Sequence, residues 1–311
     1  MNQIVSKIYD IFKNITNTQS KNENDYYNDD YIICDLLKFN KHLNFNDFND
    51  FYDFDDKNIK ILPSSFCNIQ IEGDLILSNN EIEILPENFG NIIIKGNLDL
   101  CNNKLKSLPS SFFNIQIDGD LILSNNEIEI LPENFGNIII KGNLDLCNNK
   151  LKSLPSSFCN IQIEGDLILS NNEIEILPEN FGNIIIKGNL DLRNNKLKSL
   201  PSSLFNIQID GDLILSNNEI EILPENFGNI SIKGNLNLSN NKIKSLPQSF
   251  CNIQIEGNLN LSNNNIMYLS KNFSNIKIKC NLFLSNYIYI LKYIKKNDFK
   301  FIKNIYIFYD K

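Results

Sequence analysis

The chain has 311 residues and a formal net charge of −8, from 29 lysines and arginines against 37 aspartates and glutamates. This balance argues against a general nucleic-acid binder, which needs a basic field facing the phosphate backbone. A single histidine excludes a multi-histidine metal site, and seven cysteines without a C-x-x-C pair indicate neither a zinc knuckle nor a dithiol redox centre. We expect the cysteines to be reduced and structural.

The N-terminal segment, residues 1–49, lies outside the repetitive part of the chain. Residues 4–15 predict a short amphipathic helix, and residues 16–30, rich in Asn, Asp, Ser and Lys, predict a flexible stretch. Residues 31–39 are apolar enough to be ordered as an N-terminal cap. His42 follows in a polar stretch and is predicted to be a surface residue.

Neither end of the sequence predicts export or membrane insertion. Charges at Lys7, Asp10 and Lys13 interrupt the first apolar stretch, which therefore lacks the continuous apolar core of a signal peptide. Lysines interrupt the apolar residues between 281 and 309 too often for a membrane span. We therefore expect a cytoplasmic protein that does not enter a membrane.

Residues 73–279 form a tandem repeat. All of its units have the same length, which is the distance in the sequence from Gly73 to Gly96. A glycine opens each of nine consecutive units, and the nine prolines keep the same spacing. The units alternate in two types. Type A reads GDLILSNNEIEILPENFGNIIIK, as at 73–95, and type B reads GNLDLCNNKLKSLPSSFFNIQID, as at 96–118. The near-identity of the copies indicates a recent tandem duplication of an A–B pair.

Each unit predicts a short strand, a turn and an extended return. Leu98 and Leu100 alternate with polar residues, the period of two that is typical of a half-buried strand. Asn102 and Asn103 follow, and asparagine favours turns because its amide can bond the neighbouring backbone. No stretch has a 3.6-residue apolar period, so we expect little helix on the opposite side of the unit.

The pattern L-x-L-x-x-N-x-L/I-x-x-L-P-x-x-F, as at residues 98–112, resembles the leucine-rich repeat, and its nine consecutive copies cover residues 73–279. The resemblance implies a curved repeat solenoid with a parallel β-sheet on its concave face, in which each unit buries its apolar side against its neighbours. One frame departs from the family pattern, because Lys95 stands three residues before Leu98 and the apolar residue is Ile94. The composition is similar to that of leucine-rich repeat proteins from AT-rich genomes, such as those of amoebae or large DNA viruses.

The asparagine of the family pattern is expected to be structural. Its side chain should be buried in an internal ladder, where the amide satisfies backbone groups of the turn. The matching residues are Asn80, Asn103, Asn126, Asn149, Asn172, Asn195, Asn218, Asn241 and Asn264.

Charged residues follow the same two-unit alternation. Stacking should place Glu81 beside Lys104 and Glu83 beside Lys106, and the last residue of each unit alternates in sign as well. Each exposed pair is worth about 0–1 kcal/mol. A slip by one unit would place like charges together, so the pattern also favours the correct stacking.

Degenerate sequences flank the nine units. Residues 50–72 keep the apolar frames and predict a degenerate first repeat. Residues 280–311 begin with a unit that has lost its glycine, and we interpret them as a degenerate repeat followed by a C-terminal cap. Within this segment, residues 304–307 read as the closing N-I-x-I of a unit, displaced by several residues.

No pattern predicts catalysis, a cofactor or a metal site. The glycines that open the units are a whole unit apart, so the sequence has no glycine-rich phosphate loop. Asp99, Asp145 and Asp191 should face the concave side at intervals of about 10 Å. Inverting glycosidases hold two carboxylates about 6.5–9.5 Å apart, but a uniform wall offers nothing to separate an acid from a base. We expect a protein that is not an enzyme.

The remaining function is protein binding by the concave face, with no partner identified and the oligomeric state left open. Substitutions between copies concentrate in the later units, so the predicted partner-binding residues are Arg193, Asn237, Asn260 and Phe283. Phe283 is expected to be an exposed aromatic of the kind enriched at interfaces. The alternative is a structural or recently expanded repeat without a dedicated ligand, which the near-identity of the copies favours. A third possibility, an adaptor that recruits other machinery through residues 1–49, has no motif to support it.

Overall fold

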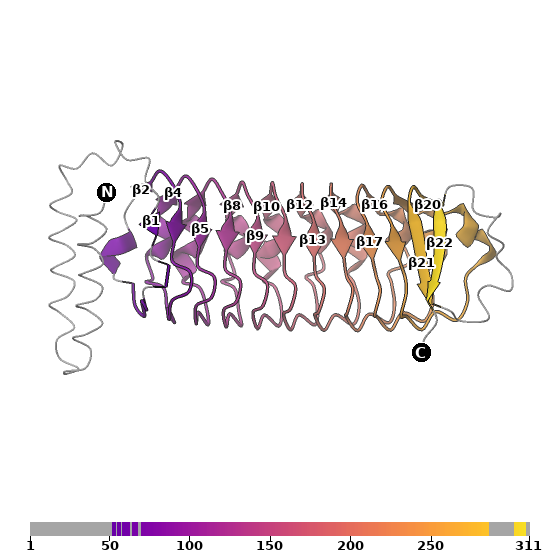
Figure 1. The fold of residues 1–311 in the computed structure, drawn as a ribbon, viewed down its shortest axis with the longest axis horizontal. Helices are drawn as coiled ribbons and strands as arrows, with labels where there is room; N and C mark the ends of the chain where they lie inside the picture. The colour runs from indigo at the N-terminus through magenta and orange to yellow at the C-terminus, as the bar shows by residue number, and fades with distance from the viewer. Residues whose placement is uncertain are drawn as a thin grey trace.

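A computed structural model describes residues 70–285 without a gap, together with residues 52–53, 55–56, 58–62, 64–67 and 302–308. The predictions for residues 1–49 and for 286–301 lie outside the described residues. In the described part, the repeat units stack as successive turns of one solenoid (Figure 1). The predicted fold class, a repeat solenoid with parallel strands and little helix, is confirmed.

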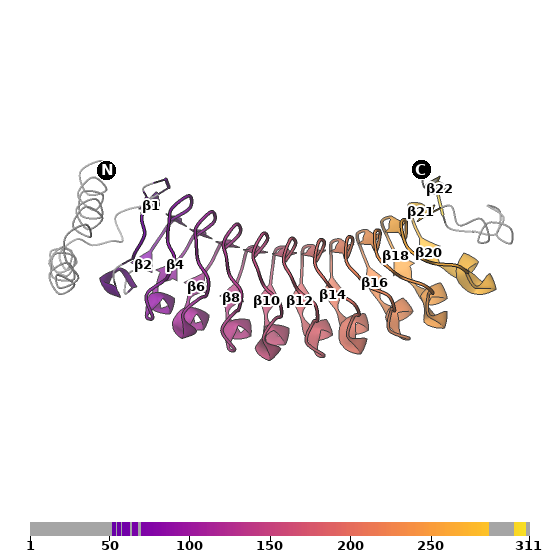
Figure 2. The ribbon, with the colours of Figure 1, turned by 90° about the horizontal axis from the view of Figure 1, so that it is seen from below.

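Short parallel strands line the concave face (Figure 2). Each strand pairs with its neighbour in a register of one full unit, so that Leu75 lies opposite Leu98 and Ile76 lies opposite Asp99. The sheet has twelve strands, in the order β1 (Tyr52–Asp53), β3 (Leu75–Ile76), β5 (Leu98–Asp99), β7 (Leu121–Ile122), β9 (Leu144–Asp145), β11 (Leu167–Ile168), β13 (Leu190–Asp191), β15 (Leu213–Ile214), β17 (Leu236–Asn237), β19 (Leu259–Asn260), β21 (Asn281–Ser285) and β22 (Asn304–Phe308).

The opposite side of each unit contains a second short strand. Seven of these form one parallel sheet: β2 (Gln70–Ile71), β4 (Ile93–Ile94), β6 (Gln116–Ile117), β8 (Ile139–Ile140), β10 (Gln162–Ile163), β12 (Ile185–Ile186) and β14 (Gln208–Ile209). Three more form another: β16 (Ser231–Ile232), β18 (Gln254–Ile255) and β20 (Lys277–Ile278).

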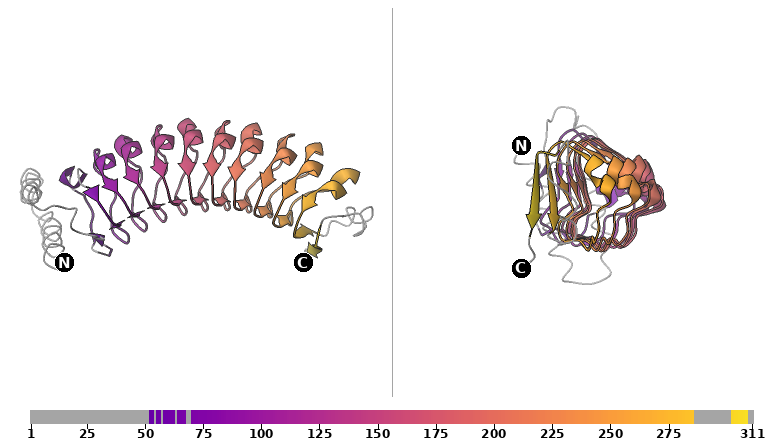
Figure 3. Two further views of the ribbon diagram at one scale, coloured as in Figure 1. Left: turned by 90° about the horizontal axis from the view of Figure 1, so that it is seen from above. Right: turned by 90° about the vertical axis from the view of Figure 1, so that its right-hand side faces the viewer.

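The outer edge of the arc is made of 3-10 helices, and the described residues contain no α-helix (Figure 3). Each 3-10 helix is three to five residues long, too short to impose a 3.6-residue apolar period on the sequence. They are η3 (Ser64–Cys67), η4 (Phe89–Asn91), η5 (Ser110–Asn114), η6 (Phe135–Asn137), η7 (Ser156–Asn160), η8 (Phe181–Asn183), η9 (Ser202–Asn206), η10 (Phe227–Asn229), η11 (Gln248–Asn252) and η12 (Lys271–Asn275).

A stack of phenylalanine rings under the 3-10 helices explains the curvature. The rings of consecutive units lie nearly parallel, with centroids 6.0 Å apart for Phe89 and Phe112 and 6.5 Å apart for Phe158 and Phe181. Neighbouring strands are only about 4.8 Å apart. Because the outer side of each unit is thicker than the inner side, the stack bends with the sheet on the inside. Leu204 replaces phenylalanine in one unit and is buried in its place.

The glycine that opens each unit is required by a close approach between units. A Cβ atom at Gly119 would lie 2.3 Å from the Asn97 Oδ1 and 2.7 Å from the Gly96 carbonyl oxygen. The Gly119 N–H donates to that same carbonyl at 3.0 Å. None of the described glycines has a positive φ, so space, and not backbone freedom, fixes glycine here.

Asparagine occupies the left-handed backbone positions. The first asparagine of each Asn-Asn pair has a φ between 52° and 55°, a conformation that asparagine adopts more readily than other non-glycine residues. Its side chain also links units, as where the Asn102 Nδ2 donates to the Asn79 Oδ1 at 2.8 Å. Sequence analysis predicted a turn here but not its handedness. The residues are Asn79, Asn102, Asn125, Asn148, Asn171, Asn194, Asn217, Asn240 and Asn263.

The last strand corrects one interpretation of the C-terminal sequence. Residues 304–307 do not close the preceding unit. They lie in β22, which pairs with β21 in the ordinary register, Asn281 opposite Asn304 and Phe283 opposite Tyr306. The spacing of the repeat is therefore kept at this end, although residues 286–300 between the two strands have lost the repeat pattern.

Candidate binding surface

Each concave strand presents three outward positions, which we name by row. The first row is the residue after the opening glycine, the middle row lies two residues later, and the third row lies two residues later again. Asp74, Ile76 and Ser78 occupy the three rows in one type A unit. The leucines between them, Leu75 and Leu77, point inward and are fully buried.

The middle row alternates apolar and acidic side chains at the centre of the sheet. All of its members are half-buried except Asp191, which is buried. In order along the sheet they are Ile76, Asp99, Ile122, Asp145, Ile168, Asp191, Ile214, Asn237, Asn260 and Phe283.

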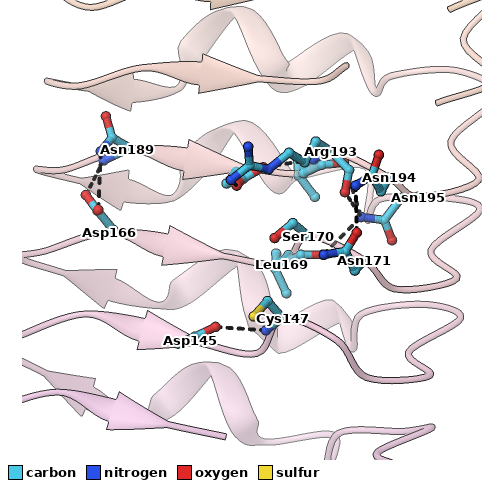
Figure 4. Close-up of polar contacts among 12 residues, drawn as sticks. Asp145, Cys147, Asp166, Leu169, Ser170, Asn171, Asn189, Arg193, Asn194 and Asn195 are labelled. Carbon is cyan, nitrogen blue, oxygen red and sulfur yellow. Dashed lines mark hydrogen bonds and ion pairs between the residues drawn. The ribbon is translucent and has the colours of Figure 1, made fainter. Parts of the chain in front are cut away.

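The first row forms a second ladder that sequence analysis missed. The Asp74 Oδ1 accepts the backbone N–H of Asn97 at 2.7 Å, and the Asn97 Oδ1 accepts that of Asp120 at 2.7 Å. The contact recurs down the solenoid, where Asn189 also donates its side-chain amide to Asp166 (Figure 4). The sequence signal for this ladder is the Asp or Asn that follows every opening glycine. Both side chains carry an acceptor oxygen at the same position.

The third row holds serines and cysteines, and its thiols are not reactive. The Cys101 N–H donates to the Asp99 Oδ1 at 2.9 Å, and Cys147 donates to Asp145 in the same way (Figure 4). Burial, with the neighbouring aspartates, raises the pKa of both thiols to about 12. Because the thiolate is the nucleophile, these two cysteines stay inert near neutral pH.

Arg193 is the first of the predicted partner-binding residues. It lies in the third row, where its positive charge neutralises an aspartate of its own unit. Its Nη2 is 2.8 Å from the Asp191 Oδ2, and its backbone N–H donates to the Asp191 Oδ1 at 3.0 Å. The guanidinium stays exposed to solvent, whereas the carboxylate beneath it is buried. Arg193 therefore covers one acidic group of the middle row.

The other three predicted partner residues lie side by side in the middle row, on β17, β19 and β21. The Asn237 Oδ1 accepts the Ser239 hydroxyl at 2.8 Å, and the Asn260 Oδ1 accepts the Ser262 hydroxyl at 2.7 Å. The expectation of an exposed aromatic at Phe283 was wrong. Its ring is half-buried because it stacks on Tyr306 of β22, with centroids 5.0 Å apart.

The concave face thus divides into two regions. The acidic region, residues 73–233, carries seven aspartates in its first and middle rows against one cation, Arg193. The amide region, residues 234–285, carries asparagines and Phe283 in the same two rows. The middle row by itself does not reveal this division, because the change from aspartate to asparagine occurs in the first row as well. The aspartates are Asp74, Asp99, Asp120, Asp145, Asp166, Asp191 and Asp212.

The nine asparagines predicted to form an internal ladder are all buried. Asn195 is typical: its Oδ1 accepts the Ile174 N–H at 3.0 Å, and its Nδ2 donates to the carbonyls of Leu169 at 2.9 Å and Leu192 at 3.1 Å. Each ladder asparagine thereby ties its own turn to the preceding unit (Figure 4). Their role is structural, since they do not reach the concave surface.

Opposite charges lie side by side on the flank that follows the asparagine turn. Lys150 is 2.7 Å from Glu127, Lys196 is 2.7 Å from Glu173, and both pairs are exposed. The hydrogen bond from each lysine lowers the pKa of the paired glutamate. Exposed pairs of this kind add little stability.

Within the described residues, no three His, Cys, Asp or Glu side chains are grouped so as to hold a metal ion. The same part of the chain has no helix of the length and apolarity needed to cross a bilayer.

Comparisons with known proteins support the fold. Residues 235–253 match the Leucine Rich Repeat family model. Among solved structures, the functional domain of InlJ from Listeria monocytogenes is similar at 16% identity and a TM-score of 0.55, over 81% of this chain and 52% of that one. YopM from Yersinia pestis is similar at 20% identity and a TM-score of 0.49, over 92% of this chain and 77% of that one. No curated protein matches the sequence. The chain folds as a leucine-rich-repeat solenoid.

Proposed function

We propose that the chain is a non-enzymatic protein-interaction module whose concave face binds an extended, basic segment of a partner protein. Repeat solenoids offer extended concave surfaces of this kind. The observation that carries the proposal is the acidic region, where six half-buried aspartates of the first and middle rows lie beside the isoleucines of the middle row, in addition to Asp191, which Arg193 covers. Such a surface fits a segment in which basic and apolar groups alternate.

The strand spacing sets the spacing of those groups. Asp99 and Asp145 lie two strands apart in the middle row, which corresponds to about 10 Å. A partner segment in the polyproline II conformation has three residues per turn and rises about 3.1 Å per residue, so basic residues three positions apart lie on one side and would face successive aspartates. Ile122 and Ile168, in the intervening units, would contact apolar side chains between them.

The amide region is a second contact within the same proposal. Asn237 and Asn260 present amides where earlier units present carboxylates, and Phe283 borders them. We therefore also propose a partner contact centred on Arg193, Asn237, Asn260 and Phe283. The experiment below distinguishes this contact from binding to the acidic region.

The test is selection of linear peptides from a random display library on the full-length chain. Selected peptides should carry Lys or Arg at every third position, and their binding should weaken with salt because exposed charges are screened. The double variant Asp99→Asn, Asp145→Asn should lose this binding. Asparagine is native in this position at Asn237, where its Oδ1 accepts the N–H of Ser239 as the Asp99 Oδ1 accepts that of Cys101.

The control variant Asp118→Asn, Asp210→Asn removes the same charge away from the concave face, where these aspartates pair with Lys141 and Lys233. It should bind like the parent chain. Loss of binding only in Asn237→Ala, Asn260→Ala would move the contact to the amide region. Peptides without basic residues, or no selected peptide, would contradict the proposal and favour a structural repeat without a ligand.

A further inference from the structure

A row of exposed apolar side chains runs along one flank of the solenoid, outside the concave face. Each belongs to a unit in the type A phase and follows the asparagine turn, and in the first four of these units a proline comes two residues later. The exposed fractions are 75% for Ile84, 65% for Ile130, 64% for Ile176, 69% for Ile222 and 74% for Tyr268. Single exposed apolar side chains are ordinary on soluble proteins, whereas these five recur in one row at a fixed spacing. We call this row the isoleucine flank.

Serine occupies the same position in the type B units. Ser153 forms a parallel bridge to Ile176, and Ser199 forms one to Ile222, so large and small side chains alternate along the flank. Successive isoleucines are therefore about 10 Å apart at ordinary strand spacing. Ser199, Leu200, Ile222 and Pro224 line an open depression on this flank.

The charges beside this row alternate in the same phase. Type A units place Glu129 and Glu175 next to their isoleucines, and type B units place Lys152 and Lys198 next to their serines. Lys198 lies 3.4 Å from Glu175. Each type A unit thus presents an isoleucine and a negative charge, and each type B unit presents a serine and a positive charge.

We propose that the isoleucine flank is a docking surface for a second copy of this chain, in antiparallel orientation. When a type A unit of one copy faces a type B unit of the other, isoleucine meets serine and glutamate meets lysine in the same register. A partner satisfies every contact only if its apolar and charged side chains alternate with the same period as this flank. A second copy of this chain has that period. The flank is separate from the concave face, so the inference is independent of the proposed function.

The orientation follows from symmetry and curvature. A two-fold axis along the solenoid would place each unit against its own copy, with glutamate against glutamate and arcs that curve in opposite directions. A two-fold axis across the solenoid that passes between two units reverses one copy, brings type A against type B and lets both arcs curve the same way. Such a contact is closed and self-complementary. Because the nine units begin and end in the type A phase, eight of them pair in this register, over about 35 Å at strand spacing.

The experiment is sedimentation velocity of the full-length chain over concentrations up to about 100 µM. The parent chain should form dimers, and Ile130→Ser, Ile176→Ser should weaken dimerisation by roughly tenfold or more. Serine is native in this position in the neighbouring units, so the variant should keep its fold. The matched control is Ile139→Gln, Ile185→Gln, which replaces two exposed isoleucines of β8 and β12 with the residue native in the neighbouring units.

A charge exchange tests the register. The variant Glu129→Lys, Glu175→Lys and the variant Lys152→Glu, Lys198→Glu should each self-associate more weakly than the parent, because like charges then face each other. Mixed in equal amounts, the two should associate like the parent chain. A monomeric parent chain, an equal loss in the matched control, or a mixture that stays monomeric would overturn the proposal.

Discussion

The acidic and amide regions of the concave face share one scaffold and differ in what they present. In both, the leucines of the strands are buried, the ladder asparagines bond the preceding turn, and phenylalanines stack under the 3-10 helices. Between Asp145 and Asn237 the middle row loses a charge, while the backbone pairing stays the same. The outward positions can therefore change the surface without disturbing the interior.

The largest effect on stability should come from substitutions in the buried scaffold that the two regions share. Asn149→Ala and Asn241→Ala should each lower the free energy of unfolding by about 2 kcal/mol, because each leaves a buried N–H without a partner and removes one of the two amide donors to buried leucine carbonyls. Urea denaturation measures both values. The control Asn160→Ala lies in the same unit as Asn149, on the exposed end of η7, and should change stability little. A clear difference between the two ladder variants would show that the scaffold is not shared.

A second change should convert one region into the other. Asn237→Asp with Asn260→Asp extends the acidic region by two carboxylates that keep the same acceptor atoms. Binding of a selected basic peptide should tighten by about fivefold, since each exposed charge pair is worth about 0–1 kcal/mol. Calorimetry at two salt concentrations measures the change. Asn160→Asp with Asn206→Asp adds the same charge on the outer edge and should leave the affinity unaltered.

Arg193 is the one cation of the acidic region, and its removal tests whether the acidic charge of that region binds the basic peptide. Arg193→Ser exposes the Asp191 carboxylate, and serine is native in this position at Ser216 and Ser239. Binding of the basic peptide should tighten by about threefold, within the range of a single exposed pair. Weaker binding would instead make Arg193 a partner contact, as the sequence predicted.

The smallest effect should be the response to acid. Hydrogen bonds from Lys150, Lys196 and Lys242 lower the pKa values of Glu127, Glu173 and Glu219. A carboxyl group whose pKa is lower when folded adds stability above its unfolded pKa of about 4.3 and loses it as the pH falls through the folded value. The melting temperature should therefore fall slightly below about pH 4.

Replacing these three glutamates with glutamine should flatten that acid response. An unchanged response in the triple variant would contradict the assignment of the acid sensitivity to these three glutamates.

The architecture could be predicted from the sequence because the repeated pattern indicates which positions point inward. Leu98, Asn103 and Phe112 recur at fixed spacing, and each is buried in the position that the pattern implied. The left-handed turn at Asn102 was not predicted, because a turn signal does not specify its φ. The first-row ladder was missed because Asp74 and Asn97 were read as separate residue types and not as one acceptor oxygen.

The candidate site was harder to predict because it depends on contacts between units. The exposure of Phe283 is decided by Tyr306, which lies one repeat length later, beyond a stretch that has lost the repeat pattern. Arg193 read as a free cation in the sequence, whereas a contact with Asp191 within its own unit neutralises it. Composition at one position cannot reveal such pairings.

The alternation of type A and type B units limits how the length of this chain can change during evolution. Loss of one unit, such as 142–164, would bring Glu127 beside Glu173 and Lys141 beside Lys187 at the new junction. Loss or gain of an A–B pair leaves every junction as it was. Recombination between copies is therefore tolerated best in steps of two units, and the near-identical pairs in the sequence are the lengths by which such a gene would grow or shrink.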